Sequence, residues 1–105
     1  ITPSDIRYKK NIHSIDKALN KLLLLNGVYY DLRAEEFPAM QFESRQQIGL
    51  IAQNVETVIP NAVVTLSDGF KGVDYARLVP LLIEAVKDLN KKVEELEKKI
   101  DKQKN

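Results

Sequence analysis

Cysteine is absent from this 105-residue chain, and histidine occurs once, at His13. Without cysteine the chain forms no disulfide and no thiolate metal site. A histidine-based metal site or a Ser-His-Asp triad would have to be built around a single imidazole ring. We therefore expect no metal and no cofactor, and we interpret His13 as a surface or interface residue.

Long apolar runs and an excess of charge are missing too. The longest purely apolar run, residues 22–25, is far too short to span a bilayer, and the opening ITPSDIRYKK lacks the apolar core of a signal peptide. Sixteen basic and fifteen acidic residues give a net charge of +1, which offers no electrostatic case for nucleic acid or an anionic membrane as partner. The chain does not begin with Met, so we expect a piece of a longer protein.

What remains is the composition of a small globular domain. The hydrophobic fraction of 44% and the charged fraction of 30% are typical of a folded chain with a modest core. No internal repeat or low-complexity linker divides it. We expect one domain over residues 1–105, with a head at 5–76 and a projecting oligomerisation helix at 77–105.

The first half of the chain predicts a helix and then a strand. Apolar residues recur at spacings of three and four, which defines one helical face: Ile12, Ile15, Leu19, Leu22 and Leu23. Ser14 would cap this helix, and Asn26-Gly27 would end it. Residues 28–33, VYYDLR, are rich in β-formers and predict a strand, and a second strand is expected near residues 40–43.

The second half predicts a strand, a helix, a hairpin and a long final helix. IGLIAQNVETVIP begins like a strand at Ile48 and becomes helical after Ala52, and Pro60 ends that helix. Asp68-Gly69 between two apolar runs is a strong hairpin signal. From Tyr75 onward the pattern is helical.

The final helix carries a heptad seam of about three heptads, formed by Val79, Leu82, Val86, Leu89, Val93, Leu96 and Ile100. Burial of each of these side chains would stabilise the protein by roughly 1.5–3 kcal/mol, and this free energy is not gained while the side chain stays in water. The helix could pack back on its own head, but Lys92 and Glu97 at the g and following e positions favour a parallel coiled coil. Val at a with Leu at d leans towards two strands, a weak preference over so short a seam that the head can override.

The opening motif SDIRYKKNI, residues 4–12, has two interpretations. In the first it is an ordinary helix start, with Ser4 or Thr2 as the cap, Asp5 near the positive helix end and Lys9 in solvent. In the second, Ser4 is a nucleophile whose proton is taken by a base. With one histidine in the chain, Lys9 is the natural candidate for that base.

The chemical interpretation makes demands on the surroundings of these residues. A lysine accepts a proton only as the neutral amine, a form favoured by burial or by a neighbouring cation such as Arg7 or Lys10. An ideal helix would not align two residues five apart, but a turn before a helix start could. Donors for the developing oxyanion would be backbone N–H groups or the amide of Gln47 or Gln53.

Three stretches of the chain carry a resemblance: SDIRYKKNI at 4–12, IGLIAQNVETVIPNAV at 48–63 and GVDYARLVPLLIEAVKDLNKKVEEL at 72–96. Taken together, they resemble the endosialidase-type intramolecular chaperone domain. This family is a serine autopeptidase found at the C-terminus of phage tail spikes and fibres, with relatives in a membrane-anchored eukaryotic transcription factor family. The resemblance covers nearly the whole chain from Ser4.

The resemblance implies an α+β fold: a small mixed head of helices, short strands and a hairpin, followed by a long coiled-coil helix, in a homotrimer. The trimer would hold the upstream stem of its own precursor in register and then cut the Pro3–Ser4 bond. Ser4 would be the nucleophile and Lys9 the general base, with Asp5, Gln47 and Gln53 as supporting residues. Assembly would take place in the host bacterial cytoplasm, with release from the mature fibre after cleavage.

Two other functions stay open at this point. One is a non-catalytic trimerisation module that keeps the fold without cleavage. The other is a coiled-coil adaptor that presents its head to another protein, which predicts a dimer or a free monomer. No nucleic acid, membrane or small-molecule cofactor is expected in any of the three cases.

Overall fold

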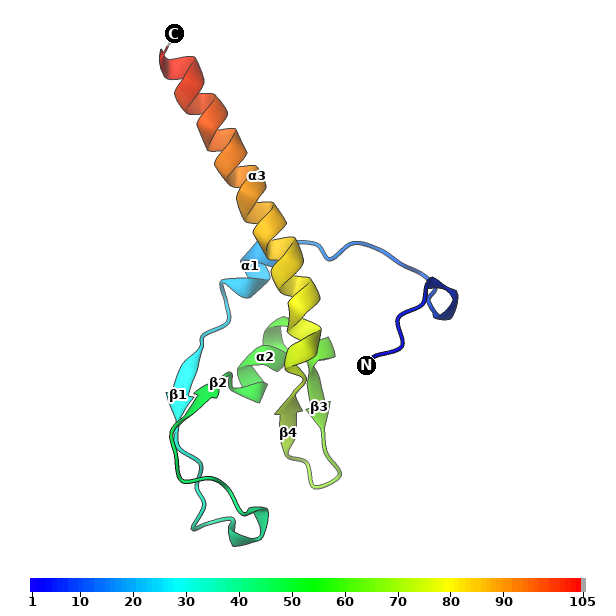
Figure 1. Cartoon of the computed structure of the whole chain (residues 1–105), viewed down its shortest axis with the longest axis vertical. Helices are drawn as coiled ribbons and strands as arrows, with labels where there is room; N and C mark the ends of the chain where they lie inside the picture. Colours follow the sequence, from blue (N-terminus) through cyan, green and yellow to red (C-terminus); the bar gives the residue numbers. More distant parts are fainter. Residues whose placement is uncertain (105) are drawn as a thin grey trace.

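A computed structural model describes residues 1–104 of the chain. An N-terminal arm, a small head and one long helix follow one another (Figure 1). The radius of gyration is 19.1 Å, against about 13 Å for a compact domain of this length. The difference arises because the arm and the helix both project from the head. Residue 105, the last of the predicted projecting helix, lies outside the described residues.

The arm contains one 3-10 turn, η1 (Ile6–Tyr8), and leads to a short helix, α1 (Ala18–Leu22). The predicted helix start at Ser14 is wrong, because Lys17 at the N-cap of α1 has a left-handed backbone with φ of 52°. A short helix is stabilised mainly by packing of its apolar face. Ala18 and Leu19 are buried in the core, whereas Ile12 is exposed. The helix is therefore short and includes the two buried residues, while Ile15 and Leu25 pack against the core from outside it.

The predicted strand after α1 is present as β1 (Val28–Tyr30), and it pairs antiparallel with β2 (Gln47–Gly49). The expected strand near residues 40–43 is wrong. The loop between β1 and β2 instead holds a 3-10 turn, η2 (Pro38–Met40), which ends at Gln41 with a left-handed φ of 52°. Proline lacks an N–H for a strand ladder and favours the first position of such a turn.

A second helix and a second hairpin complete the head. The helix α2 (Ala52–Val58) is followed by a 3-10 turn, η3 (Pro60–Ala62), and by the antiparallel strands β3 (Val63–Thr65) and β4 (Lys71–Val73). The predicted hairpin turn is confirmed. Gly69 adopts φ of +86°, a conformation that glycine reaches without strain. The Phe70 N–H donates to Asp68 Oδ1 at 2.9 Å.

The final helix, α3 (Leu78–Lys104), is preceded by a 3-10 turn, η4 (Tyr75–Arg77). One face of its first turns packs against the head, mainly against α1. The core consists of buried side chains from α1, α2, η3 and this face: Ala18, Leu19, Val55, Ala62, Leu78, Leu81 and Ala85. The mixed fold with a long C-terminal helix is thus confirmed. No helix among residues 1–104 is both long enough and apolar enough to cross a membrane.

The seven seam residues of α3 lie outside this core. Each is 43–61% exposed in the single chain. The head therefore packs against a different face of α3, and the packing of the seam against its own head does not occur in this structure.

We expect Leu81→Ala to lower the free energy of unfolding by about 2–5 kcal/mol, because Leu81 is fully buried and truncation leaves a cavity in a small core. Leu24→Ala, at an exposed leucine of the same head, should change it by less than about 1 kcal/mol. Urea unfolding at one fixed protein concentration measures both variants. Equal losses in the two would contradict the assignment of the core.

Candidate active site on the N-terminal arm

The candidate site is built by the single turn η1. Asp5 precedes the turn with an extended backbone, and its Oδ1 accepts from the Arg7 N–H at 2.9 Å. The Tyr8 N–H donates to the Asp5 carbonyl at 3.0 Å, and the Lys9 N–H donates to the Ile6 carbonyl at 3.1 Å. The chain reverses over these residues and is extended again at Lys9. The cap of this turn is therefore Asp5, and the expected cap at Ser4 or Thr2 is wrong.

This reversal brings Ser4 and Lys9 together. Lys9 Nζ lies 2.7 Å from Ser4 Oγ, although five residues separate them in sequence. A turn was the arrangement that could align the two residues, since an ideal helix would have kept their side chains apart. Both residues are exposed in the single chain. At this distance one proton can pass between the amine and the hydroxyl, which is the geometry required of a base and its nucleophile.

Asp5 and Arg7 form a second pair on the same turn. Arg7 Nε and Nη2 donate to Asp5 Oδ1 and Oδ2 at 3.1 and 3.0 Å. The side-chain hydrogen bonds from Arg7, followed by the bond from its backbone N–H, lower the pKa of the Asp5 carboxyl below its ordinary 3.8. Because Asp5 compensates the charge of Arg7, the expectation that Arg7 acts as a free cation beside Lys9 is not supported. Lys10 is the remaining candidate.

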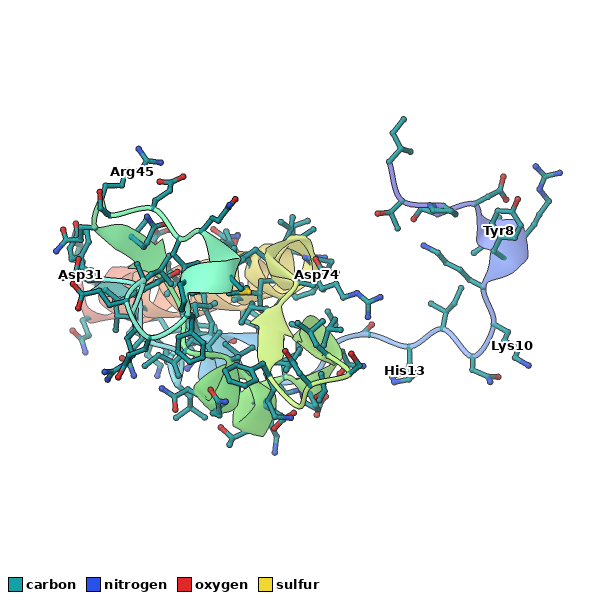
Figure 2. All side chains as sticks on the ribbon, turned by 90° about the horizontal axis from the view of Figure 1, so that it is seen from below. Tyr8, Lys10, His13, Asp31, Arg45 and Asp74 are labelled. Atoms are coloured by element: carbon teal, nitrogen blue, oxygen red, sulfur yellow. The ribbon has the colours of Figure 1, made fainter. Side chains whose placement is uncertain are left out.

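The other predicted site residues lie elsewhere. His13 is exposed on the arm, with Nδ1 3.1 Å from the Asn11 carbonyl oxygen. Gln47 Nε2 donates to the Arg45 carbonyl at 2.9 Å, and Gln53 lines an open groove of about 660 Å³ on the head. Figure 2 shows the arm, with Tyr8 labelled, standing apart from the head. Ser4 and Lys9 are thus brought together, while both glutamines belong to the head.

Metal ligands are not grouped in the part of the chain that the structure describes. Within residues 1–104, no set of three or more His, Cys, Asp or Glu side chains is placed to hold a metal ion. The groups brought together at η1 are the Ser4 hydroxyl, the Lys9 amine and the Asp5–Arg7 ion pair.

Two contacts that bear on the position of α3 were missed by sequence reasoning. Asp88 Oδ2, on α3, accepts from the Leu19 N–H of α1 at 3.3 Å, and the Tyr75 hydroxyl oxygen accepts from the Leu50 N–H at 2.8 Å. Each contact joins residues at least 25 positions apart. Local periodicity carries no signal for such pairs. The one available signal for Asp88 was its position on the same helical face as Leu81 and Ala85, where a charged residue among apolar ones indicates a polar contact.

Comparison with known proteins gives the family of the chain. A peptidase-family model described as chaperone of endosialidase matches residues 4–64, more than half of the chain. The chain belongs to this family. The match begins at Ser4, the residue whose hydroxyl contacts Lys9, so the family's first matched position coincides with the candidate nucleophile.

Similar proteins include two phage fibres and one animal protein. The chain is 41% identical over 102 residues to the long tail fiber protein Gp37 of Enterobacteria phage K3 and to that of phage T2, covering 92% of the chain. It is 32% identical over 105 residues to Myelin regulatory factor homolog 1 of Caenorhabditis elegans, covering 96% of the chain. The matched region makes up 8%, 7% and 11% of these three proteins, respectively.

We expect the Asp5 carboxyl to titrate below its ordinary value of 3.8. A depressed pKa in the folded turn means that the Asp5–Arg7 pair stabilises η1 above the unfolded pKa and is lost as the pH falls through the folded one. Arg7→Gln should raise the Asp5 pKa towards its ordinary value, and Arg33→Gln should leave it unchanged. Side-chain NMR titration of Asp5 in the three proteins measures this, and an Asp5 pKa insensitive to Arg7→Gln would contradict the pairing.

Proposed function

We propose that this chain is an intramolecular chaperone that trimerises, holds the upstream stem of a phage tail spike or fibre in register, and then releases itself by cutting the Pro3–Ser4 bond. The observation that carries the catalytic part is the 2.7 Å contact between Ser4 Oγ and Lys9 Nζ. Family membership and the likeness to phage long tail fibre proteins support the chaperone part.

The proposed cleavage uses the two side chains in sequence. Lys9, as the neutral amine, takes the proton of the Ser4 hydroxyl, and Oγ attacks the carbonyl carbon of Pro3. The bond from that carbon to the Ser4 nitrogen breaks, and the nitrogen receives the proton from the Lys9 ammonium. Water then hydrolyses the resulting ester, which leaves a carboxylate on Pro3 and a free amine and hydroxyl on Ser4.

The exposed seam of α3 supports the proposed trimer. The head occupies the face of α3 that carries Leu78, Leu81 and Ala85, so the seam stays available for partner helices. Joining three chains at one end raises the effective concentration of their upstream segments. Slow nonlocal pairing in the stem then becomes an intramolecular process.

Cleavage after assembly would make the assembly of the stem hard to reverse. Once the domain is released, the folded stem no longer carries the element that assembled it, and the assembly is held kinetically. We place the folding and cleavage steps in the cytoplasm of the host bacterium during phage assembly, and the release at the mature fibre.

A non-catalytic trimerisation module is the second candidate, and one observation favours it. Ser4 and Lys9 are exposed on an arm that stands apart from the head (Figure 2). In such a position water, rather than fixed donors, surrounds the carbonyl to be attacked, and an oxyanion in water gains less from its hydrogen bonds.

Expressed with its natural upstream segment, the protein should split into two products, the smaller one beginning at Ser4. Ser4→Ala and Lys9→Ala should stay whole, because each removes one partner of the proton transfer. Lys98→Ala is the matched control, since it deletes an exposed lysine on the outer face of α3 and leaves the Ser4–Lys9 contact intact. The intact denatured masses decide the outcome. A whole but trimeric unmutated protein would leave the non-catalytic module as the function.

The oligomeric state should depend on the seam. Leu89→Asp places a carboxylate at a d position and should convert a trimer into monomers, because burying an unpaired charge is costly. Lys91→Asp introduces the same side chain at an f position on the outer face, and this variant should remain trimeric. Sedimentation equilibrium of both variants measures the state. A monomeric or dimeric unmutated protein would favour the coiled-coil adaptor instead.

A further inference from the structure

A limb of the head, residues 28–49, extends from the core as a long hairpin. It consists of β1, the loop with η2, and β2, and its two strands pair with each other. Figure 1 shows this limb pointing away from the C-terminal end of α3. The chain enters the limb just after Leu25 and leaves it at Leu50, and both leucines pack partly buried against the core. The direction of the limb is therefore decided at this base.

The base of the limb is tied to the beginning of α3 by a tyrosine. The hydroxyl oxygen of Tyr75 accepts from the backbone N–H of Leu50, the residue directly after β2, at 2.8 Å. Tyr75 lies in η4, which runs directly into α3. The hydroxyl sits at the tip of a stiff ring, so this hydrogen bond fixes the distance between the limb and the start of the helix.

Gly49 makes this approach possible for a steric reason. A Cβ atom at position 49 would lie 2.5 Å from the Tyr75 hydroxyl oxygen and 3.4 Å from Tyr30 Cε1. A carbon 2.5 Å from a hydroxyl oxygen overlaps it, and any residue other than glycine would push Tyr75 away from Leu50. The φ of Gly49 lies outside the left-handed region, so space and not backbone conformation demands a glycine.

We propose that Gly49, Leu50 and Tyr75 form a latch that fixes the direction of the limb relative to α3. The latch joins two segments, IGLIAQ and VDYARL, that lie in different parts of the sequence. It makes the limb and the oligomerisation helix one rigid unit. The exposed apolar side chains of the limb, such as Tyr29 and Ile48, are thereby held at a set orientation to the seam. The latch depends on contacts within one chain and does not depend on cleavage.

Amide hydrogen exchange tests the hydrogen bond of the latch directly. In Tyr75→Phe, the Leu50 amide should exchange on the order of five- to tenfold faster than in the unmutated protein, as expected for the loss of one hydrogen bond. The Val55 amide of α2 reports on the surrounding fold and should keep its protection. An unchanged Leu50 amide, or equal acceleration at both positions, would overturn the proposal.

A double-mutant cycle tests the steric part. Gly49→Ala should lower the melting temperature in the unmutated protein and should lower it much less in the Tyr75→Phe background, where the overlapping oxygen is gone. Gly72→Ala is the matched control: Gly72 also lies in a strand, its added Cβ meets nothing within 4 Å, and its effect should be the same in both backgrounds. An equal cost of Gly49→Ala in both backgrounds would overturn the latch.

The direction of the limb gives a third readout. Residual dipolar couplings of limb and α3 amides should fit one common alignment in the unmutated protein and two different alignments in Tyr75→Phe. This measurement, with the exchange of Leu50, decides the proposal even if Gly49→Ala fails to fold. A single common alignment in Tyr75→Phe would overturn the role of the latch in orienting the limb.

Discussion

The packing of one face of α3 against α1 is the contact on which the rest of the molecule depends. Leu78, Leu81 and Ala85 supply much of a small core, and at this size each buried side chain is a large share of the net stability. The same helix keeps its apolar seam on another face, exposed in the single chain. Because the core and the seam use different faces, the helix can stabilise the head and, on our proposal, also bind partner helices without a conflict between the two.

In the arm, by contrast, the geometry of the candidate site is determined by neighbouring residues alone. One 3-10 turn, capped by Asp5, is sufficient to bring Ser4 and Lys9 to 2.7 Å. This contact needs nothing from the head, which explains how the arm can stand apart and still present the pair. Reactivity is a separate matter, because a lysine base and an oxyanion both require surroundings that water does not provide. In the single chain both residues are exposed, so the cleavage that we propose needs surroundings that the arm alone does not provide.

Besides the core, two polar contacts connect α3, and the turn η4 that leads into it, to the rest of the head. Asp88 accepts from the first turn of α1, and Tyr75 accepts from the residue after β2. Each bond gives a partner to a backbone N–H where a regular element begins or ends; the first is partly buried and the second is exposed. The final helix therefore organises both ends of the head, and the head in turn sets the direction of the seam.

Sequence alone determined the elements that rest on local chemistry. The heptad seam, the Asp68-Gly69 hairpin and the helix after Ala52 follow from periodicity and turn propensities, whereas the Ser4–Lys9 pair was implied by the resemblance to a family. Only the tertiary structure decided that α1 is five residues long, that a turn replaces the strand near 40–43, and that Gly49 faces Tyr75. The length of α1 and the approach of Gly49 to Tyr75 depend on contacts between distant residues, where packing overrides local preference. The turn near 40–43 begins at Pro38, a local signal against a strand that the sequence interpretation did not use.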